Sequence, residues 1–176
     1  MRKQNNIISI IVRITILIII TLSFSACSDV CDNKENNNFE WNKKIAVAYV
    51  HSYATAIGEA IPFIDTDSAK IEYIQNAVEP ISFYPDSSGY FYVYNFDCIN
   101  IAHAKQKNLV GNNLKDYKDS RGKFVIRELS AMAKTGSGYV EYHWKKPGKI
   151  GKKRKLGYVE PIPNTEYFIG TGVYLE

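Results

Sequence analysis

The sequence lacks the motifs that mark several common classes of protein. It has only three cysteines, too few for a disulfide framework, and no Cys-x-x-Cys-His motif for covalent haem attachment. It has no Gly-x-Ser-x-Gly elbow and no phosphate-binding loop. Its three histidines, His51, His103 and His143, show no metal-ligand spacing. We therefore expect no enzyme, no metal site and no cofactor.

The charge of the chain gives little reason to expect a nucleic-acid partner. The formal net charge is +4, from 22 Lys and Arg against 18 Asp and Glu. Three of the basic residues, Arg2, Lys3 and Arg13, precede residue 27, and without them the balance is 19 against 18, or +1. The basicity thus comes largely from the N-terminal segment. The length of 176 residues fits one domain of ordinary size.

The first 26 residues are typical of an export signal. Residues 1–6 are polar and positive, and an apolar run follows, interrupted by Arg13. Its uncharged part, Ile14 to Ala26, is shorter than the roughly 20 residues of a membrane-spanning helix. It fits the core of a signal peptide, about 7–15 residues followed by small side chains. We therefore predict a signal peptide over residues 1–26.

Ser25-Ala26-Cys27 resembles the lipobox of bacterial lipoproteins, in which the cysteine is lipidated. Phe24 departs from the usual aliphatic residue at the first position of that motif. Residues 27–38 are polar and are expected to form a tether. The alternative is an uncleaved anchor helix over residues 7–26, with Arg13 near its centre at a cost of about 2.5–3.5 kcal/mol. Both interpretations place the body outside the cytoplasm, on the periplasmic or outer surface of a membrane.

The body is predicted to be α+β. Apolar residues at every fourth position indicate a long helix over residues 39–61, and a second helix is expected over about 68–78. The period then changes to two, with Tyr90, Tyr92, Tyr94 and Phe96 on one face of a strand. A second strand is expected over 99–104, with Ile99, Ile101 and His103 on one face, then a helix over 123–134. Three more strands are expected over 139–144, 156–161 and 167–174. This order predicts an antiparallel sheet with helices packed against it.

Two further features leave alternatives open. Residues 145–155 contain seven Lys and Arg and link two predicted strands. They form either a solvated hairpin tip or a contact for anionic lipid head groups, each charge contributing about 1 kcal/mol near such a surface. Cys31 and Cys98 are expected to stay unpaired, although an oxidising compartment would permit a disulfide.

The alternating aromatic residues of the strands predict a concave wall with phenol and imidazole groups. Arg127 lies in the third predicted helix, where it is either an exposed side chain or a fork for a carboxylate.

Several blocks of the sequence resemble the single Cache domains (type 2), the PAS-like extracytoplasmic sensor modules of bacterial receptors. They include Gly89-Tyr90-Phe91-Tyr92-Val93-Tyr94, Leu109-Val110-Gly111-Asn112-Asn113-Leu114, residues 136–148 and Ile169-Gly170-Thr171-Gly172-Val173-Tyr174. The blocks occur in the family's order over residues 39–176. His103 is followed by Ala104, where the family often has proline.

The resemblance implies a five-stranded antiparallel sheet with a long N-terminal helix, and a short-chain carboxylate as ligand. It also implies ligand contacts at Tyr92, Tyr94, His103, Arg127, Tyr142 and Trp144. Because no signalling domain follows residue 176, we expect a lipid-anchored binding protein that signals through a partner. The alternative is a structural or interaction lipoprotein that keeps the fold without a ligand.

Overall fold

The computed structural model describes residues 37–175. The predicted signal peptide, the lipobox Cys27, Cys31 and most of the tether lie outside these residues. Residues 37–41 are helical and belong to the unit that ends at Trp41, whereas the described residues from Asn42 onward belong to a second compact unit. Within the described part of the chain, no helix is both long enough and apolar enough to cross a membrane.

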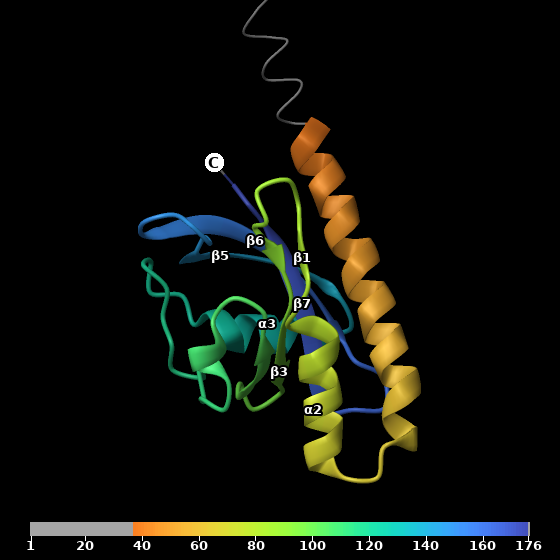
Figure 1. Ribbon diagram of the computed structural model, residues 1–176. Helices are drawn as coiled ribbons and strands as arrows, with labels where there is room; N and C mark the ends of the chain where they lie inside the picture. Colours follow the sequence, from red (N-terminus) through yellow and green to blue (C-terminus); the bar gives the residue numbers. More distant parts are fainter. Residues whose placement is uncertain (1–36, 176) are drawn as a thin grey trace, which may run out of the picture. The chain divides into compact units, whose positions relative to one another are not determined.

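Two helices precede the sheet, as predicted. Residues 37–60 are helical, and the 3-10 turn η1 (Ile61–Phe63) follows, where Pro62 ends the regular helix. Helix α2 (Asp67–Val78) begins after Thr66, whose hydroxyl accepts a hydrogen bond from the amide of Ala69 at 3.2 Å. Both helices contribute to an apolar core with the sheet, and they lie on the same side of it (Figure 1).

The main sheet has five antiparallel strands in the order β4-β3-β7-β6-β5. This confirms the predicted α+β fold with a five-stranded sheet and a long N-terminal helix. A two-stranded ladder of β1 and β2 precedes it, and α3 lies between β4 and β5 in sequence. The bounds are β1 (Ser82–Phe83), β2 (Gly89–Tyr90), β3 (Tyr92–Asn95), β4 (Asn100–His103), η2 (Lys107–Leu109), α3 (Val125–Lys134), β5 (Gly138–Lys145), β6 (Lys152–Pro161) and β7 (Tyr167–Tyr174).

The alternation along residues 90–94 divides the interior into two clusters. Phe91 and Val93 face the first two helices, together with Ile169 of β7. Tyr90, Tyr92 and Tyr94 face the other way and pack with residues of α3 and β5. The predicted shared face of Tyr90, Tyr92 and Tyr94 is confirmed, and the strand is covered on both faces.

The predicted face of β4 is wrong in one respect. Tyr92 pairs with His103 and Val93 with Ala102, but Tyr94 pairs with Asn100, so the register shifts and Ile101 is the extra residue of a bulge. Ile101 therefore packs in the helix-side cluster, whereas His103 lies against Tyr90 and Tyr92 on the opposite face.

The turn within the basic run at residues 145–155 is also shorter than expected. Strand β6 begins at Lys152, so the turn between β5 and β6 covers only residues 146–151. Lys155, the last residue of the run, has no exposed surface. It therefore belongs to the interior rather than to the hairpin tip.

Candidate functional site

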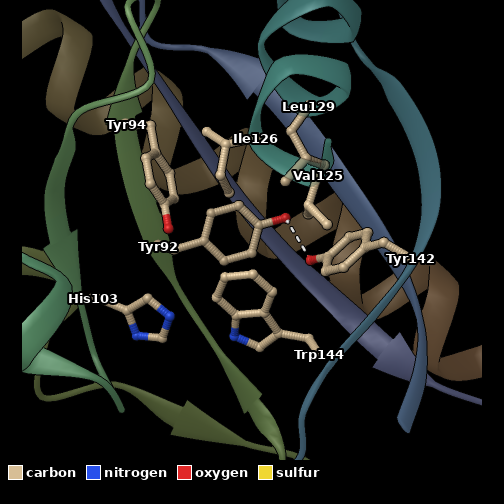
Figure 2. A pocket seen from close by; sticks show the side chains of 8 residues that line it. All are labelled: Tyr92, Tyr94, His103, Val125, Ile126, Leu129, Tyr142 and Trp144. Carbon is tan, nitrogen blue, oxygen red and sulfur yellow. Dashed lines mark hydrogen bonds between the residues drawn. The ribbon is translucent and has the colours of Figure 1, made fainter. Parts of the chain in front are cut away.

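A small cavity lies between α3 and the aromatic face of the sheet (Figure 2). Its volume is about 10 Å³, roughly the space for one water molecule. Strands β3, β4 and β5 supply its aromatic wall, and α3 supplies its aliphatic wall. The lining residues are Tyr92, Tyr94, His103, Val125, Ile126, Leu129, Tyr142 and Trp144.

Five of the six ligand contacts expected from the sequence lie in this lining, and Arg127 does not. The guanidinium of Arg127 pairs with Asp116, its Nε donates to the carbonyl of Lys115 at 2.7 Å, and it lies 4.0 Å from the ring centre of Phe124. The structure thus gives Arg127 a role in fastening the loop of residues 115–116 to α3.

The tyrosine rings fit because the strands beneath them carry glycine. Tyr142 donates its hydroxyl hydrogen to the hydroxyl of Tyr92 at 3.3 Å, as Figure 2 shows, and Tyr92 donates to the carbonyl of Thr171 at 3.3 Å. A β-carbon at Gly170 would lie 2.6 Å from the Tyr92 ring, and one at Gly157 would lie 2.7 Å from the Tyr142 ring. The two glycines therefore leave the space that the ring pair occupies.

His103 presents a hydrogen-bond donor to the site. Its Nδ1 accepts from the backbone amides of Lys105 at 3.2 Å and Gln106 at 3.0 Å, so the proton of the neutral ring resides on Nε2. That Nε2 atom is buried and has no partner among residues 37–175. Burial, together with the charge of Lys155, lowers the pKa of His103 to about 3. The ring is therefore neutral at physiological pH, and the two amides hold it in the tautomer that donates.

Lys155 is a functional candidate that the sequence reasoning missed. Its side chain is fully buried on β6, and its ammonium has no hydrogen-bond partner in the described part of the chain. The Nζ atom lies 3.9 Å from the ring centre of Tyr90, 4.9 Å from Tyr174 and 5.6 Å from Tyr92. Burial lowers the pKa of Lys155 to about 7. The faces of three tyrosines stabilise this cation, but they do not neutralise it.

A loop covers the cavity from the side of β4. The indole Nε1 of Trp144 donates to the side-chain oxygen of Gln106 at 2.6 Å, and the ring of Tyr117 lies 5.1 Å from that of Trp144. Further along, buried Asp119 accepts from the amides of Arg121 at 2.8 Å and His143 at 2.8 Å. The loop is therefore hydrogen-bonded to β5, the strand that carries Tyr142 and Trp144.

The pKa of Asp119 is lowered despite its burial. Burial alone would raise it, but the amides of His143, Arg121 and Lys123 donate to the carboxylate and outweigh that effect. Asp119 thus stays ionised as a fixed structural anchor. Across the described residues, no group of three or more His, Cys, Asp or Glu side chains is arranged to hold a metal ion.

The arrangement offers unpaired donors to an anion. It has two unpartnered donors, the Nζ of Lys155 and the Nε2 of His103, and one of them carries a positive charge when protonated. No carboxylate lies among the residues that line the cavity. Buried donors without acceptors are costly in an empty protein, and a bound anion relieves that cost.

Comparison with protein families gives a match over most of the chain. A model described as a Cache domain matches residues 29–176. The sensor histidine kinase MctS of Rhizobium johnstonii is 42% identical over 88 residues, which are 50% of this chain and 19% of that kinase. The methyl-accepting chemotaxis protein McpP of Pseudomonas putida is 29% identical over 92 residues, 52% of this chain and 17% of that receptor. The match therefore spans less than a fifth of these curated relatives.

Solved structures share the fold. A methyl-accepting chemotaxis protein from Vibrio parahaemolyticus superimposes with a TM-score of 0.69 at 30% identity, covering 80% of this chain and 93% of that one. A structure described as a Cache chemosensory domain that recognises carboxylic acids superimposes with a TM-score of 0.68 at 23% identity, covering 80% and 98%. At that identity the second likeness shows the fold alone.

Proposed function

The chain belongs to the Cache domain family, and on this premise we propose that it is an extracytoplasmic, lipid-anchored sensor protein for short-chain carboxylates, which signals through a partner protein. Cache domains are sensory ligand-binding domains of chemoreceptors and kinases rather than catalytic domains. They bind small molecules outside the cytoplasm and pass the signal to kinase or chemoreceptor modules.

The observation that carries the proposal is a pair of buried, unpartnered donors: His103 Nε2, on a residue that lines the cavity, and Lys155 Nζ, which lies 5.6 Å from the ring centre of the lining residue Tyr92. A carboxylate has two oxygens, each able to accept charge-assisted hydrogen bonds, and it would neutralise the Lys155 ammonium. In this proposal His103 Nε2 donates to the same group, and the hydroxyls of Tyr92, Tyr94 and Tyr142 orient it. Trp144 closes the apolar side. One solved structure with this fold is of a Cache chemosensory domain that recognises carboxylic acids, which agrees with this ligand class.

A ligand needs more space than the structure leaves. A volume of about 10 Å³ holds a single water, so a two- or three-carbon acid requires the wall to move outward. In this proposal the part of the loop around Gln106 moves, because a single hydrogen bond joins it to the Trp144 indole, whereas Asp119 and the Asp116–Arg127 pair keep the later part of the loop in place. We therefore propose that the empty site is contracted and that ligand entry displaces this part of the loop.

The cellular placement follows from the N-terminal segment. We propose that residues 1–26 are removed, that Cys27 is lipidated, and that residues 27–38 form a tether to the domain over residues 39–176. The protein would then be held on the periplasmic or outer surface of a membrane. Radiolabelled fatty acid should be incorporated into the wild-type chain and not into a Cys27→Ser variant. Equal incorporation into both would contradict the anchor.

The small size of the cavity favours a second candidate, an interaction lipoprotein that keeps the Cache fold without a ligand. Thermal denaturation of residues 28–176 across two- to four-carbon acids, amino acids and amines separates the two. A ligand at 100 times its Kd stabilises the fold by about 2.7 kcal/mol. For this size the midpoint should rise by roughly 5–10 °C. A rise with an acid that disappears in Lys155→Met supports the sensor. A flat panel from a folded sample supports the interaction protein.

A further inference from the structure

Four parts of the domain meet at one end of it. The hydroxyl of Tyr84, beside the β1–β2 turn, donates to the carbonyl of Asn42 in the first helix at 2.9 Å. In the same turn Asp86 pairs with Lys146 at 3.0 Å. At the end of β7, Tyr174 donates to the carbonyl of Lys145 at 2.7 Å. The start of the compact unit, its last strand and the base of the β5–β6 hairpin therefore lie together.

The hairpin continues beyond this end of the sheet. Strand β6 pairs with β7 only as far as Lys155, which lies opposite Tyr174. Strands β5 and β6 pair further with each other, at Trp144 with Lys153 and at Lys145 with Lys152. We call residues 145–153 the basic tip. It projects as an arm that no other strand borders, as Figure 1 shows for the turn after β5.

The basic tip combines one apolar side chain with several free charges. Ile150 is 96% exposed, the most exposed of the large apolar residues described. Lys145, Lys149 and Lys153 are exposed, and within residues 37–175 none of them has an ion-pair partner. Gly148 and Gly151, which flank Lys149 and Ile150, have φ of +69° and +76°. A β-carbon on either glycine would meet nothing within 4 Å, so there is open space beside both of them.

Other basic residues of the run have structural partners instead. Lys146 pairs with Asp86, and Arg154 pairs bidentately with Glu141 at 2.8 and 3.3 Å. The Nζ of Lys152 lies 4.8 Å from the ring centre of Tyr117. The three lysines are thus a distinct set: they flank the exposed isoleucine in the sequence, and their side chains have no ion-pair partner among the described residues.

We propose that the basic tip docks on an anionic phospholipid bilayer, with Ile150 entering the head-group region and Lys145, Lys149 and Lys153 contacting phosphates. An isoleucine flanked by lysines fits such a surface, because the apolar side chain can enter the head-group region while the lysines contact the phosphates. This inference rests on the proposed lipid anchor, and the chain enters the compact unit at Asn42, at the same end of the domain as the base of the hairpin. Docking would also restrain β5 and β6, which carry Trp144 and Lys155 of the ligand site.

Hydrogen exchange of the full chain on bilayers tests the inference. The chain is reconstituted in nanodiscs of phosphatidylcholine alone or with one third phosphatidylglycerol, and exchange is followed by mass spectrometry at residues 146–151. We expect roughly tenfold slower exchange on the anionic discs, and high salt should abolish the difference. The combined Lys145→Gln, Lys149→Gln and Lys153→Gln variant should lose the effect, and Ile150→Ser should reduce it.

A matched control removes the same charge elsewhere, with Lys70→Gln, Lys107→Gln and Lys134→Gln on α2, η2 and α3. It should keep the wild-type protection. Equal exchange on both discs, or protection that survives in the tip variant, would overturn the proposal, and the former result would favour an anionic protein as the partner. Co-flotation with the discs without tip protection would overturn docking alone. A chain that does not co-float would overturn the anchor and the docking together, whereas the ligand panel tests the site independently of both.

Discussion

The two faces of the sheet differ in how completely their buried groups are satisfied. On the helix side, Phe91, Val93 and Ile169 form an apolar core, and the amide of Gln75 donates to the carbonyl of Ile101 at 2.8 Å. On the aromatic side, His103 Nε2 and Lys155 Nζ are buried without partners among the described residues. One strand, β3, feeds both faces through alternate side chains. We therefore expect one face of the sheet to contribute mainly stability and the other to carry the proposed ligand site.

The difference implies that substitutions on the two faces change the free energy of unfolding in opposite directions. A change on the helix face removes packing, and no gain in stability offsets this loss. A change on the aromatic face that removes an unsatisfied group relieves a cost of folding and removes a contact for the ligand. This difference would be contradicted if substitutions on the two faces changed the free energy of unfolding and the ligand affinity in the same directions.

The largest effect on stability is expected on the helix face. Phe91 is fully buried, with its ring centre 4.5 Å from that of Tyr53 and 5.5 Å from that of Phe83. Phe91→Ala should lower the free energy of unfolding by about 3–5 kcal/mol in chemical denaturation. Phe63→Ala is the control, because Phe63 is 86% exposed and its loss should cost less than about 0.5 kcal/mol. Equal costs would mean that this face is not the stabilising core.

Lys155→Met should have the opposite sign on stability. It removes a buried ammonium without a partner, so the ligand-free protein should become more stable, most clearly below pH 7. Affinity for the acid that gives the largest shift in the thermal panel should fall about a hundredfold by calorimetry. Lys153→Met, on the same strand but exposed, should change neither by much. A Lys155→Met protein that binds normally would remove this lysine from the site.

The pH dependence should show the same lysine. Its pKa is about 7 in the folded protein against 10.5 ordinarily, so between these values the unfolded chain binds more protons. Stability without ligand should therefore rise with pH over that range, and the rise should be absent in Lys155→Met. A carboxylate ligand favours the protonated amine, so affinity should fall up to tenfold per pH unit above pH 7. An affinity that is flat from pH 6 to 9 would contradict a role for the ammonium.

The two nitrogen atoms of His103 have different roles. Nδ1 accepts hydrogen bonds from the loop amides, and Nε2 is the proposed donor to the ligand. His103→Asn places an acceptor near the position of Nδ1 and removes the donor at Nε2. It should keep most of the stability and lose about tenfold in affinity. His103→Gln keeps a donor near Nε2 and leaves the amides of Lys105 and Gln106 unsatisfied, so it should cost about 1–3 kcal/mol of stability instead. Identical effects of the two variants would show that the ring only fills space.

Periodicity was sufficient to predict the α+β fold and an aromatic wall, whereas the choice of ligand contacts came from the resemblance to Cache domains. The alternation of side chains along a strand puts Tyr92 and Tyr94 on one face of β3 and Tyr142 and Trp144 on one face of β5, and all four line the cavity. The face of Ile101 was predicted wrongly because a bulge inserts one residue into β4, and no side-chain pattern marks it. The shift explains why His103 faces the tyrosines while Ile101 does not.

Lys155 escaped prediction for a different reason. It ends a run of seven basic residues, and such runs are normally solvated, so its own position carried no separate signal. Only pairing with Tyr142 and Tyr174 on the neighbouring strands shows that it points into the aromatic cluster. A weak indication was available in the sequence, since Lys155, Gly157 and Val159 alternate into one face of β6.

Replacing Arg127 tests where the site ends, and this substitution should have the smallest effect on stability and affinity. Its guanidinium pairs with Asp116 and lies over Phe124, outside the cavity lining. Arg127→Ala should therefore lower the free energy of unfolding by about 1 kcal/mol or less, because exposed pairs contribute little. Affinity for the same acid should stay within about twofold of wild type. A large loss of affinity with unchanged stability would show that the arginine reaches the ligand after the covering loop moves, and would extend the site to the exposed side of α3.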